Sequence, residues 1–301
     1  MTLATPQPGL FTEGTAYSWF LEYTVDSNAS LDRVRQALSG VVEEQNGPHW
    51  VVAFGADLWR RLYPDGGPEK LRSFEPVGKP DGFFAPATQR DILVWLHGDR
   101  HDLNFDRARA THRHLSGVAE LDLEVTGFAY HENRDLIGFV DGTANPKDDE
   151  AKKAAALLPD ANGGSYVLTQ KWVHDLDAFN DLAVPLQEAV VGRTKEDDIE
   201  LEGDSMPPDS HVSRTDVSEN GTAMKIYRRS APFGTVGEHG LYFLAFACDL
   251  RRFQVQLERM YGVHGDGVHD RLVEFSKAVT GSYWYAPGVK ELKEALGAAK
   301  A

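Results

Sequence analysis

Cysteine is almost absent from this sequence of 301 residues. A single cysteine, Cys248, excludes an internal disulfide and any zinc or iron-sulfur site built from several thiolates. Its place inside the apolar run 241–248 favours a buried, inert thiol. Basic residues are also in the minority, because 31 Lys and Arg face 46 Asp and Glu, for a formal net charge of −15. That balance argues against non-specific binding to nucleic acid or to anionic membranes.

Long apolar runs and several common catalytic motifs are missing as well. No segment approaches the roughly 18 apolar residues of a membrane span. Residues 1–11 carry no basic residue and no long apolar stretch, so we expect no export signal and a cytoplasmic protein. Gly-x-Ser-x-Gly, the P-loop pattern and His-Glu-x-x-His do not occur, which leaves a serine hydrolase, a P-loop nucleotide site and a zinc protease unsupported.

The periodicity of the first half predicts a ferredoxin-like fold. Apolar alternation marks the strands, and helical spacing marks the segments between them. Strands are expected at 15–25, 49–55, 91–97 and 120–130, and helices at 30–44, near Trp59 and at 104–118. The main elements therefore run strand, helix, strand, strand, helix, strand, which is typical of a sheet with helices on one face.

The second half is expected to repeat this order. Residues 145–163 are charged and Ala-rich and end in a Gly pair, so we divide the chain into halves of 1–145 and 146–301. Strands are expected at 165–173, 223–229, 240–247 and 282–286, and helices at 176–191 and 250–261. A long polar insert at 194–219 interrupts the pattern, and such loops are usually functional or mobile. The prediction is an α+β fold of two ferredoxin-like halves with antiparallel sheets.

One carboxylate has a suggestive position. Asp141 follows Gly138-Phe139-Val140, which read as a strand heading into an apolar interior. Gly142 comes next and allows the backbone to turn sharply or a flat group to approach closely. A carboxylate at such an edge can lie over a cofactor. The bland alternative is that Asp141-Gly142 is only a turn.

A histidine and an arginine are further candidates. His211 lies in the polar insert, where a lone histidine is either a structural residue or a metal ligand. Arg228 ends the strand expected after that insert. A buried arginine stays charged, so it can polarise a bound oxygen species. The alternative is that Arg228 is one arm of an ion pair on a strand edge.

Four segments of this sequence occur in the order seen in dye-decolorising peroxidases. They are Gly-Phe-Val-Asp-Gly-Thr at 138–143, Gly-Arg-Thr-Lys at 192–195, Ser-His-Val-Ser-Arg at 210–214 and Arg-Arg-Ser-Ala-Pro-Phe-Gly at 228–234. The chain resembles the bacterial cytoplasmic B-type from about Pro6 to Pro287. The resemblance implies haem b held between the two halves, between sheet and helices and mainly in the C-terminal half.

The resemblance also implies site residues. His211 matches the proximal haem ligand, and Asp270 resembles the acidic residue that accepts the proximal imidazole proton. Asp141, Arg228 and Ser230 correspond to the polar residues on the opposite, distal face. Arg193 is expected near the haem propionates, and Gly142 and Thr143 are expected to contact the cofactor as part of the Asp141 motif.

The implied function is a peroxidase. It would use hydrogen peroxide to oxidise phenolic, dye-like or other one-electron donors through a ferryl intermediate. Asp141 would shuttle a proton between the peroxide oxygens, and Arg228 would stabilise charge on the departing oxygen. Asp270 would make the imidazole more anionic and raise electron density on the iron. A haem-handling protein with incidental peroxidase activity is one alternative, and a dimeric ferredoxin-like protein without a cofactor is another.

The donor and the assembly are less defined. Phenols, dyes, Mn(II) and porphyrins are all conceivable donors, and the acidic surface favours cations only mildly. Tyr283-Trp284-Tyr285 is either an electron relay to the surface or a buried strand, and the strand explains these residues better. The resemblance implies a homo-oligomer, a dimer or larger. Residues 292–301 read as a short helix without a docking tail, so encapsulin cargo is not expected.

Overall fold

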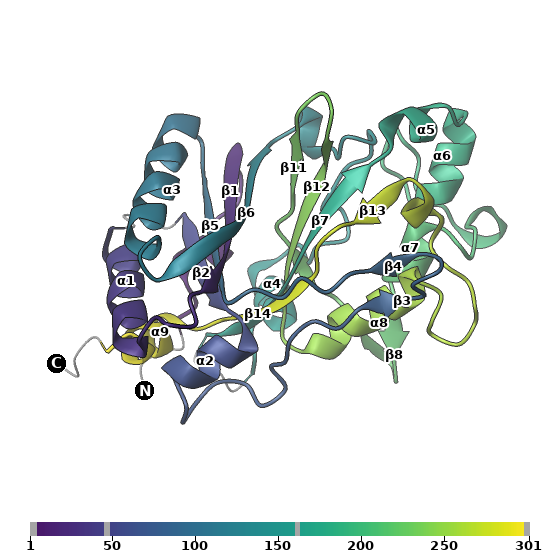
Figure 1. Ribbon diagram of the computed structural model, residues 1–301. Helices are drawn as coiled ribbons and strands as arrows, with labels where there is room; N and C mark the ends of the chain where they lie inside the picture. The colour runs from purple at the N-terminus through teal and green to yellow at the C-terminus, as the bar shows by residue number, and fades with distance from the viewer. Residues whose placement is uncertain (1–4, 45–48, 160–162, 298–301) are drawn as a thin grey trace.

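The N-terminal half is a four-stranded antiparallel sheet with two long helices on its outer face (Figure 1). The computed structural model describes residues 5–44, 49–159 and 163–297. The main elements of this half are β1 (Tyr17–Val25), α1 (Leu31–Glu44), β2 (Trp50–Phe54), β5 (Ile92–Gly98), α3 (His101–Leu115) and β6 (Ala119–Phe128). Helix α2 (Ala56–Leu62) and the short strands β3 (Val77–Gly78) and β4 (Phe84–Ala85) lie between β2 and β5. The strand order is β6-β1-β5-β2.

The C-terminal half repeats this strand order in β14-β7-β12-β11. Its strands are β7 (Ser165–His174), β8 (Ser218–Glu219), β9 (Thr222–Ala223), β10 (Tyr227–Arg228), β11 (Ala231–Gly234), β12 (His239–Ala247), β13 (Ser276–Ala278) and β14 (Ser282–Ala286). Its helices are α4 (Asp149–Ala156), α5 (Leu176–Asn180), α6 (Val184–Val191), α7 (His211–Thr215), α8 (Leu250–Met260) and α9 (Val289–Ala295). In ferredoxin-like numbering both halves have the order 4-1-3-2, so the predicted fold class is confirmed, with one refinement.

The refinement is that the two sheets close on each other. Strand β6 pairs with β11 through Gly127 and Phe233, and β2 pairs with β14 through Phe54 and Tyr285. Together with the pairing of β7 and β12, these contacts join eight strands into one barrel. A Cβ atom on Gly127 would lie 2.7 Å from the Cβ of Ala231, so the closure depends on a residue without a side chain. Figure 1 shows α1 and α3 on one side of the barrel and α5 to α8 on the other.

Strand alternation divides the side chains between the inside and the outside of the barrel. On β1, Trp19 and Leu21 share a core with Val34 and Leu38 of α1, whereas Phe20 belongs to the barrel interior. The interior is rich in aromatic residues, and the rings of Phe20 and Tyr242 stack with centroids 4.0 Å apart. The period of two along each strand therefore builds two cores from one sheet.

A carboxyl group is buried in the barrel interior. Glu22 is 1% exposed, and its Oε1 accepts hydrogen bonds from the hydroxyls of Tyr242 at 2.6 Å and Thr169 at 3.1 Å. Burial raises the pKa of Glu22 to about 7, although both hydrogen bonds oppose that rise. Arg90 and Asp122 act on the same carboxyl from a distance, with opposite signs.

Several predicted elements differ from the structure. The helix expected at 176–191 is wrong, because α5 and α6 are separate and Pro185 occupies the first turn of α6, where proline is favoured. The strand expected at 223–229 is wrong in extent, since β9 and β10 cover only its ends and β11 supplies the barrel strand. The strand expected before Asp141 is wrong as well, because Arg134 and Val140 form only an isolated bridge.

The buried strand predicted for the aromatic run near the C-terminus is confirmed. Tyr283, Trp284 and Tyr285 form part of β14 and are at most 2% exposed, which supports the buried strand over a surface relay. Cys248 is partly buried after β12, and burial raises the pKa of its thiol. The helix expected at 292–301 overlaps α9, and residues 298–301 lie outside the described part of the chain. Among the described residues, no helix is long and apolar enough to cross a bilayer.

We expect Glu22 to make the free energy of unfolding depend on pH. The folded pKa is raised from 4.5 to about 7, so the folded state holds the proton more tightly, and stability falls as pH rises through this window. The loss is on the order of 3 kcal/mol. Urea denaturation at several pH values should show that Glu22→Gln removes this slope. The exposed Glu120→Gln is the control, and equal slopes in Glu22→Gln and wild type would contradict the prediction.

Candidate active site

A mostly apolar cavity lies against the outer face of β7 and β12. Leu168, Gln170 and Trp172 alternate along β7 with the residues that point into the barrel, and they line this cavity. Its other walls come from the Asp141 loop and from helices α7 and α8. Apolar side chains contribute most of these walls, among them Ile137, Phe139, Leu241, Phe243, Leu257 and Met260.

His211 enters the cavity from α7. Ser210 caps this short helix, because its hydroxyl accepts a hydrogen bond from the N–H of Ser213. The Nδ1 of His211 lies 2.6 Å from Oδ2 of Asp270. In a neutral imidazole, donation from Nδ1–H to this carboxylate leaves the lone pair of Nε2 free to bind a metal. The His211 side chain is 24% exposed, which is consistent with a ring that faces the cavity.

Asp270 is placed by the backbone. Its side chain is 0% exposed, and its Oδ1 accepts the N–H of Leu272 at 2.8 Å as the cap of a short 3-10 helix, Arg271–Glu274. One carboxylate oxygen thus holds the main chain, and the other holds the imidazole. This arrangement fixes both the tautomer and the orientation of the His211 ring.

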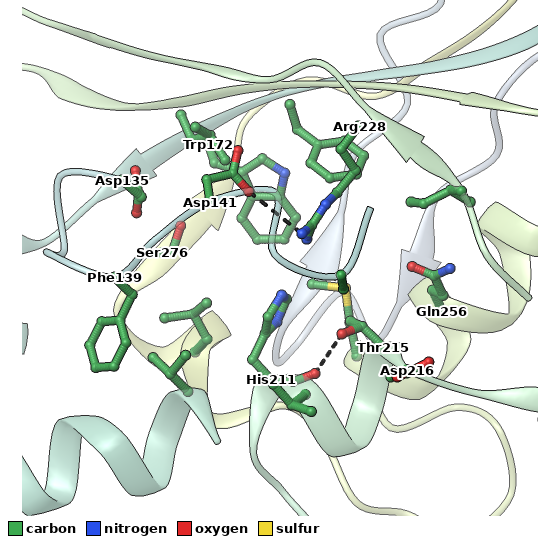
Figure 2. A pocket seen from close by; sticks show the side chains of 18 of the residues that line it. Asp135, Phe139, Asp141, Trp172, His211, Thr215, Asp216, Arg228, Gln256 and Ser276 are labelled. Atoms are coloured by element: carbon green, nitrogen blue, oxygen red, sulfur yellow. Dashed lines mark hydrogen bonds and ion pairs between the residues drawn. The ribbon is translucent and has the colours of Figure 1, made fainter. Parts of the chain in front are cut away.

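Asp141 and Arg228 lie across the cavity from His211 (Figure 2). Oδ1 of Asp141 accepts a hydrogen bond from the backbone N–H of Gly142 at 2.7 Å. Nη2 of Arg228 is 3.7 Å from the same oxygen, which is an ion pair but too long for a hydrogen bond. Both side chains are about four-fifths buried, at 24% and 20% exposed. The acid and the guanidinium thus share a mostly buried wall without close contact.

The remaining predicted residues divide between two places. Thr143 and Arg193 line the same cavity, and Asp198 joins them: its Oδ2 accepts from the hydroxyl of Thr143 at 2.5 Å, and its Oδ1 from Nε of Arg193 at 2.8 Å. Gly142 and Ser230 instead line a second cavity. The hydroxyl oxygen of Ser230 accepts the N–H of Leu244 at 3.3 Å.

The second cavity adjoins the first through the charged pair. Asp141 and Arg228 line both cavities. The second is more polar, with walls that include Glu13, Thr15, Ser18, Asn133, Lys152 and Ser230. A small polar molecule in this cavity would therefore reach the carboxylate and the guanidinium without crossing the apolar walls.

The sequence interpretation missed a polar cluster in the first cavity. His174 Nε2 lies 3.2 Å from Oδ1 of Asp135, and its Nδ1 lies 2.7 Å from the hydroxyl of Ser276. All three residues are buried. The available signal was alternation, because His174 continues the face of β7 that carries Gln170 and Trp172, although the predicted strand stops at 173.

Asn145 is a second residue without a predicted role. Its N–H donates to the carbonyl of Gly142 at 3.0 Å, so residues 142–145 form a turn. Its amide contacts the backbone of Arg228. The available signal was a Gly with an Asn three residues later, since both residue types favour turns.

Two family models and a curated relative match most of the chain. Residues 7–129 match the family model described as Dyp-type peroxidase, N-terminal, and residues 132–291 match Dyp-type peroxidase, C-terminal. A protein named dye-decolorizing peroxidase from Mycolicibacterium paratuberculosis is 36% identical over 303 residues, which covers 96% of this chain and 85% of that protein.

Solved structures of dyp-type peroxidases also match this chain over nearly its whole length. A dyp-type peroxidase protein from Shewanella oneidensis superposes with a TM-score of 0.89 at 34% identity, covering 96% of this chain and 98% of that one. A variant of DypB from Rhodococcus jostii, solved in complex with heme, has a TM-score of 0.87 at 34% identity and covers 97% of this chain and 99% of that one.

We expect Gly138→Ala to destabilise the loop that carries Asp141. Gly138 has φ +91°, which is unfavourable for alanine, and a Cβ would lie 2.6 Å from Cε of Lys195. Lysine can move, so the backbone sets the cost, about 1–2 kcal/mol. Urea denaturation measures it. Gly237→Ala is the control, because a Cβ there meets no described atom within 4 Å. Equal stability of the two variants would refute this reading.

Proposed function

The chain belongs to the Dyp-type peroxidase family, and we propose that it binds haem b in its apolar cavity and reduces hydrogen peroxide with electrons from a phenolic, dye-like or other one-electron donor. One observation carries this proposal. An imidazole backed by a buried carboxylate faces an acid and a guanidinium across a single cavity.

The residues of the cavity fit a haem. Its walls are mostly apolar, as the faces of a porphyrin require. His211 would hold the iron through Nε2, since Nδ1 is engaged by Asp270, which is a common arrangement for histidine ligands. Arg193 is partly buried at the cavity wall and would lie near the propionates, with Thr143 beside it. Gly142 lines the second cavity rather than this one, so a contact of Gly142 with the cofactor is not supported.

Bound haem supplies an iron at which the oxygen–oxygen bond of peroxide is cleaved. The protein's part is to move a proton and to hold charge. Oδ1 of Asp141 is engaged by the N–H of Gly142, so Oδ2 is the atom that takes the proton from one peroxide oxygen and returns it to the other. Arg228 stabilises the negative charge on the departing oxygen, because an arginine side chain carries a permanent positive charge.

The second cavity provides the route for peroxide in this proposal. Its polar walls suit a small hydrogen-bonding molecule, and it reaches Asp141 and Arg228 directly. Ser230 contributes a hydroxyl to that route. On the other face, Asp270 orients His211 and raises its basicity as a ligand.

The proposal keeps three expectations from the sequence. They are a division into two halves at 1–145 and 146–301, a cytoplasmic location, and a homo-oligomer, a dimer or larger. A haem-handling protein with incidental peroxidase activity is the second candidate. The charged pair favours the peroxidase, because binding haem alone does not require an acid and an arginine 3.7 Å apart on the face opposite the imidazole.

Asp141→Ala and Arg228→Leu should each lower kcat/KM for peroxide about 100-fold or more, because each removes a group that acts on the peroxide oxygens. Stopped-flow mixing of the haem-loaded protein with peroxide measures this step separately from donor oxidation. The exposed Arg113→Leu on α3 is the control and should react at the wild-type rate. Wild-type peroxide rates in both site variants would support the haem-handling alternative.

His211→Ala should abolish the haem absorption spectrum of the wild type, since the proposed iron ligand is lost. Asp270→Asn should retain the cofactor but lose about 10- to 100-fold in peroxide reactivity, as is usual when the partner of a metal ligand is removed. Haem titration followed by visible absorption checks both variants. His101→Ala, at the exposed start of α3, is the control. An unaltered spectrum in His211→Ala would overturn the ligand assignment.

A further inference from the structure

The side chain of Asn145 is bonded twice to the backbone of Arg228. Its Nδ2 donates to the Arg228 carbonyl oxygen at 2.9 Å, and its Oδ1 accepts the Arg228 N–H at 2.9 Å. Its own N–H closes the turn that begins at Gly142. One residue thus ties the turn that follows Asp141 to the strand that carries Arg228, although the two segments are 83 residues apart in the chain.

The position of β10 explains why an amide fits there. Strand β10 is at the end of the sheet order, and Arg228 pairs with Ala245 of β12 on one side. The outward N–H and C=O of Arg228 would otherwise face the partly buried space beside the turn. The amide of Asn145 presents one donor and one acceptor in a plane, as a peptide of a neighbouring strand does.

The ion pair itself is too loose to set this geometry. Asp141 and Arg228 approach only to 3.7 Å, whereas the two bonds of Asn145 have ordinary hydrogen-bond lengths. Each such bond contributes about 1 kcal/mol, and a pair in one plane restricts rotation as well. The relative placement of the acid and the guanidinium therefore depends on Asn145 more than on their mutual attraction.

We propose that Asn145 is a positioning residue for the peroxide reaction. It holds the Asp141 turn in register with β10, so that the carboxylate and the guanidinium can act on the two oxygens of one peroxide molecule. This inference rests on the proposed function for its kinetic consequence, but the backbone clamp can be measured without turnover.

The kinetic test uses haem-loaded Asn145→Ala and Asn145→Asp. Alanine removes both bonds, and an ionised aspartate keeps the acceptor but repels the Arg228 carbonyl. Both variants should lower the rate constant for peroxide by about tenfold or more, since a small misplacement of catalytic groups is costly. The kcat/KM for the donor should change less than about twofold. Asn104→Ala is the matched control, because Asn104 is buried and its amide also bonds a backbone carbonyl, that of Tyr17.

A double-mutant cycle tests whether Asn145 acts through Arg228. In the Arg228→Leu background, Asn145→Ala should cause little further loss, because the group it positions is already gone. Full additivity of the two losses would overturn the proposal. So would a peroxide rate that falls equally in Asn145→Ala and Asn104→Ala, which would make the effect one of general stability.

Hydrogen exchange gives the second readout. The Arg228 amide hydrogen should exchange about fivefold faster or more in Asn145→Ala, because about 1 kcal/mol of protection is lost. Asn104→Ala should leave that exchange unchanged. Unchanged exchange in Asn145→Ala would show that the clamp does not hold in solution. A third outcome is faster exchange of the Arg228 amide in Asn145→Ala together with a wild-type peroxide rate in Arg228→Leu. The proposed function would then fail, and the positioning role of Asn145 with it. The backbone clamp itself would stand.

Discussion

Closure of the two sheets into one barrel is the constraint on which the rest of the structure depends. The closure rests on short pairings between β6 and β11 and between β2 and β14. Once it is made, each strand of the barrel has one face toward an aromatic interior and one face outward. On β7 the outward face becomes the wall of the apolar cavity, so the shape of the candidate site is a direct result of how the halves meet.

Three carboxylates illustrate how position decides the use of the same chemical group. Glu22 is enclosed by the barrel, and burial raises its pKa to about 7. Asp270 is equally enclosed, but a backbone N–H and an imidazole each engage one of its oxygens. Asp141 is anchored through one oxygen by the N–H of Gly142, and the residue lines two cavities. Burial makes the first group favour its protonated form, the second orients a ring, and the third is the group proposed above to transfer a proton.

Local sequence patterns were sufficient for most of the regular elements. The strands and helices of the first half follow their periodicities, although α3 begins three residues earlier than expected. Pro185 could have indicated the start of a new helix, since proline favours the first turn. The break at Arg229 and Ser230 between β10 and β11 had no local signal, and both strands keep one register on β12, where Arg228 pairs with Ala245 and Ala231 with Tyr242.

The candidate site was accessible from the sequence only in part. His211, Asp141 and Arg228 stand in recognisable segments, and the structure brings them to one cavity. The contacts of His174 with Asp135 and Ser276 join residues far apart in the chain, so no spacing rule could find them. Barrel closure is equally non-local. It depends on pairs such as Gly127 with Phe233, which carry no pattern of their own.

The clamp on Arg228 has a consequence for how the molecule meets its neighbours. A strand at the margin of a sheet offers unpaired peptide groups to which a strand from another chain can add, and this is a common origin of aggregation. Because Asn145 fills the outward peptide positions of Arg228, a foreign strand cannot dock there without first expelling a native side chain. The residue that orders the polar wall therefore also shields it from intermolecular β-sheet growth.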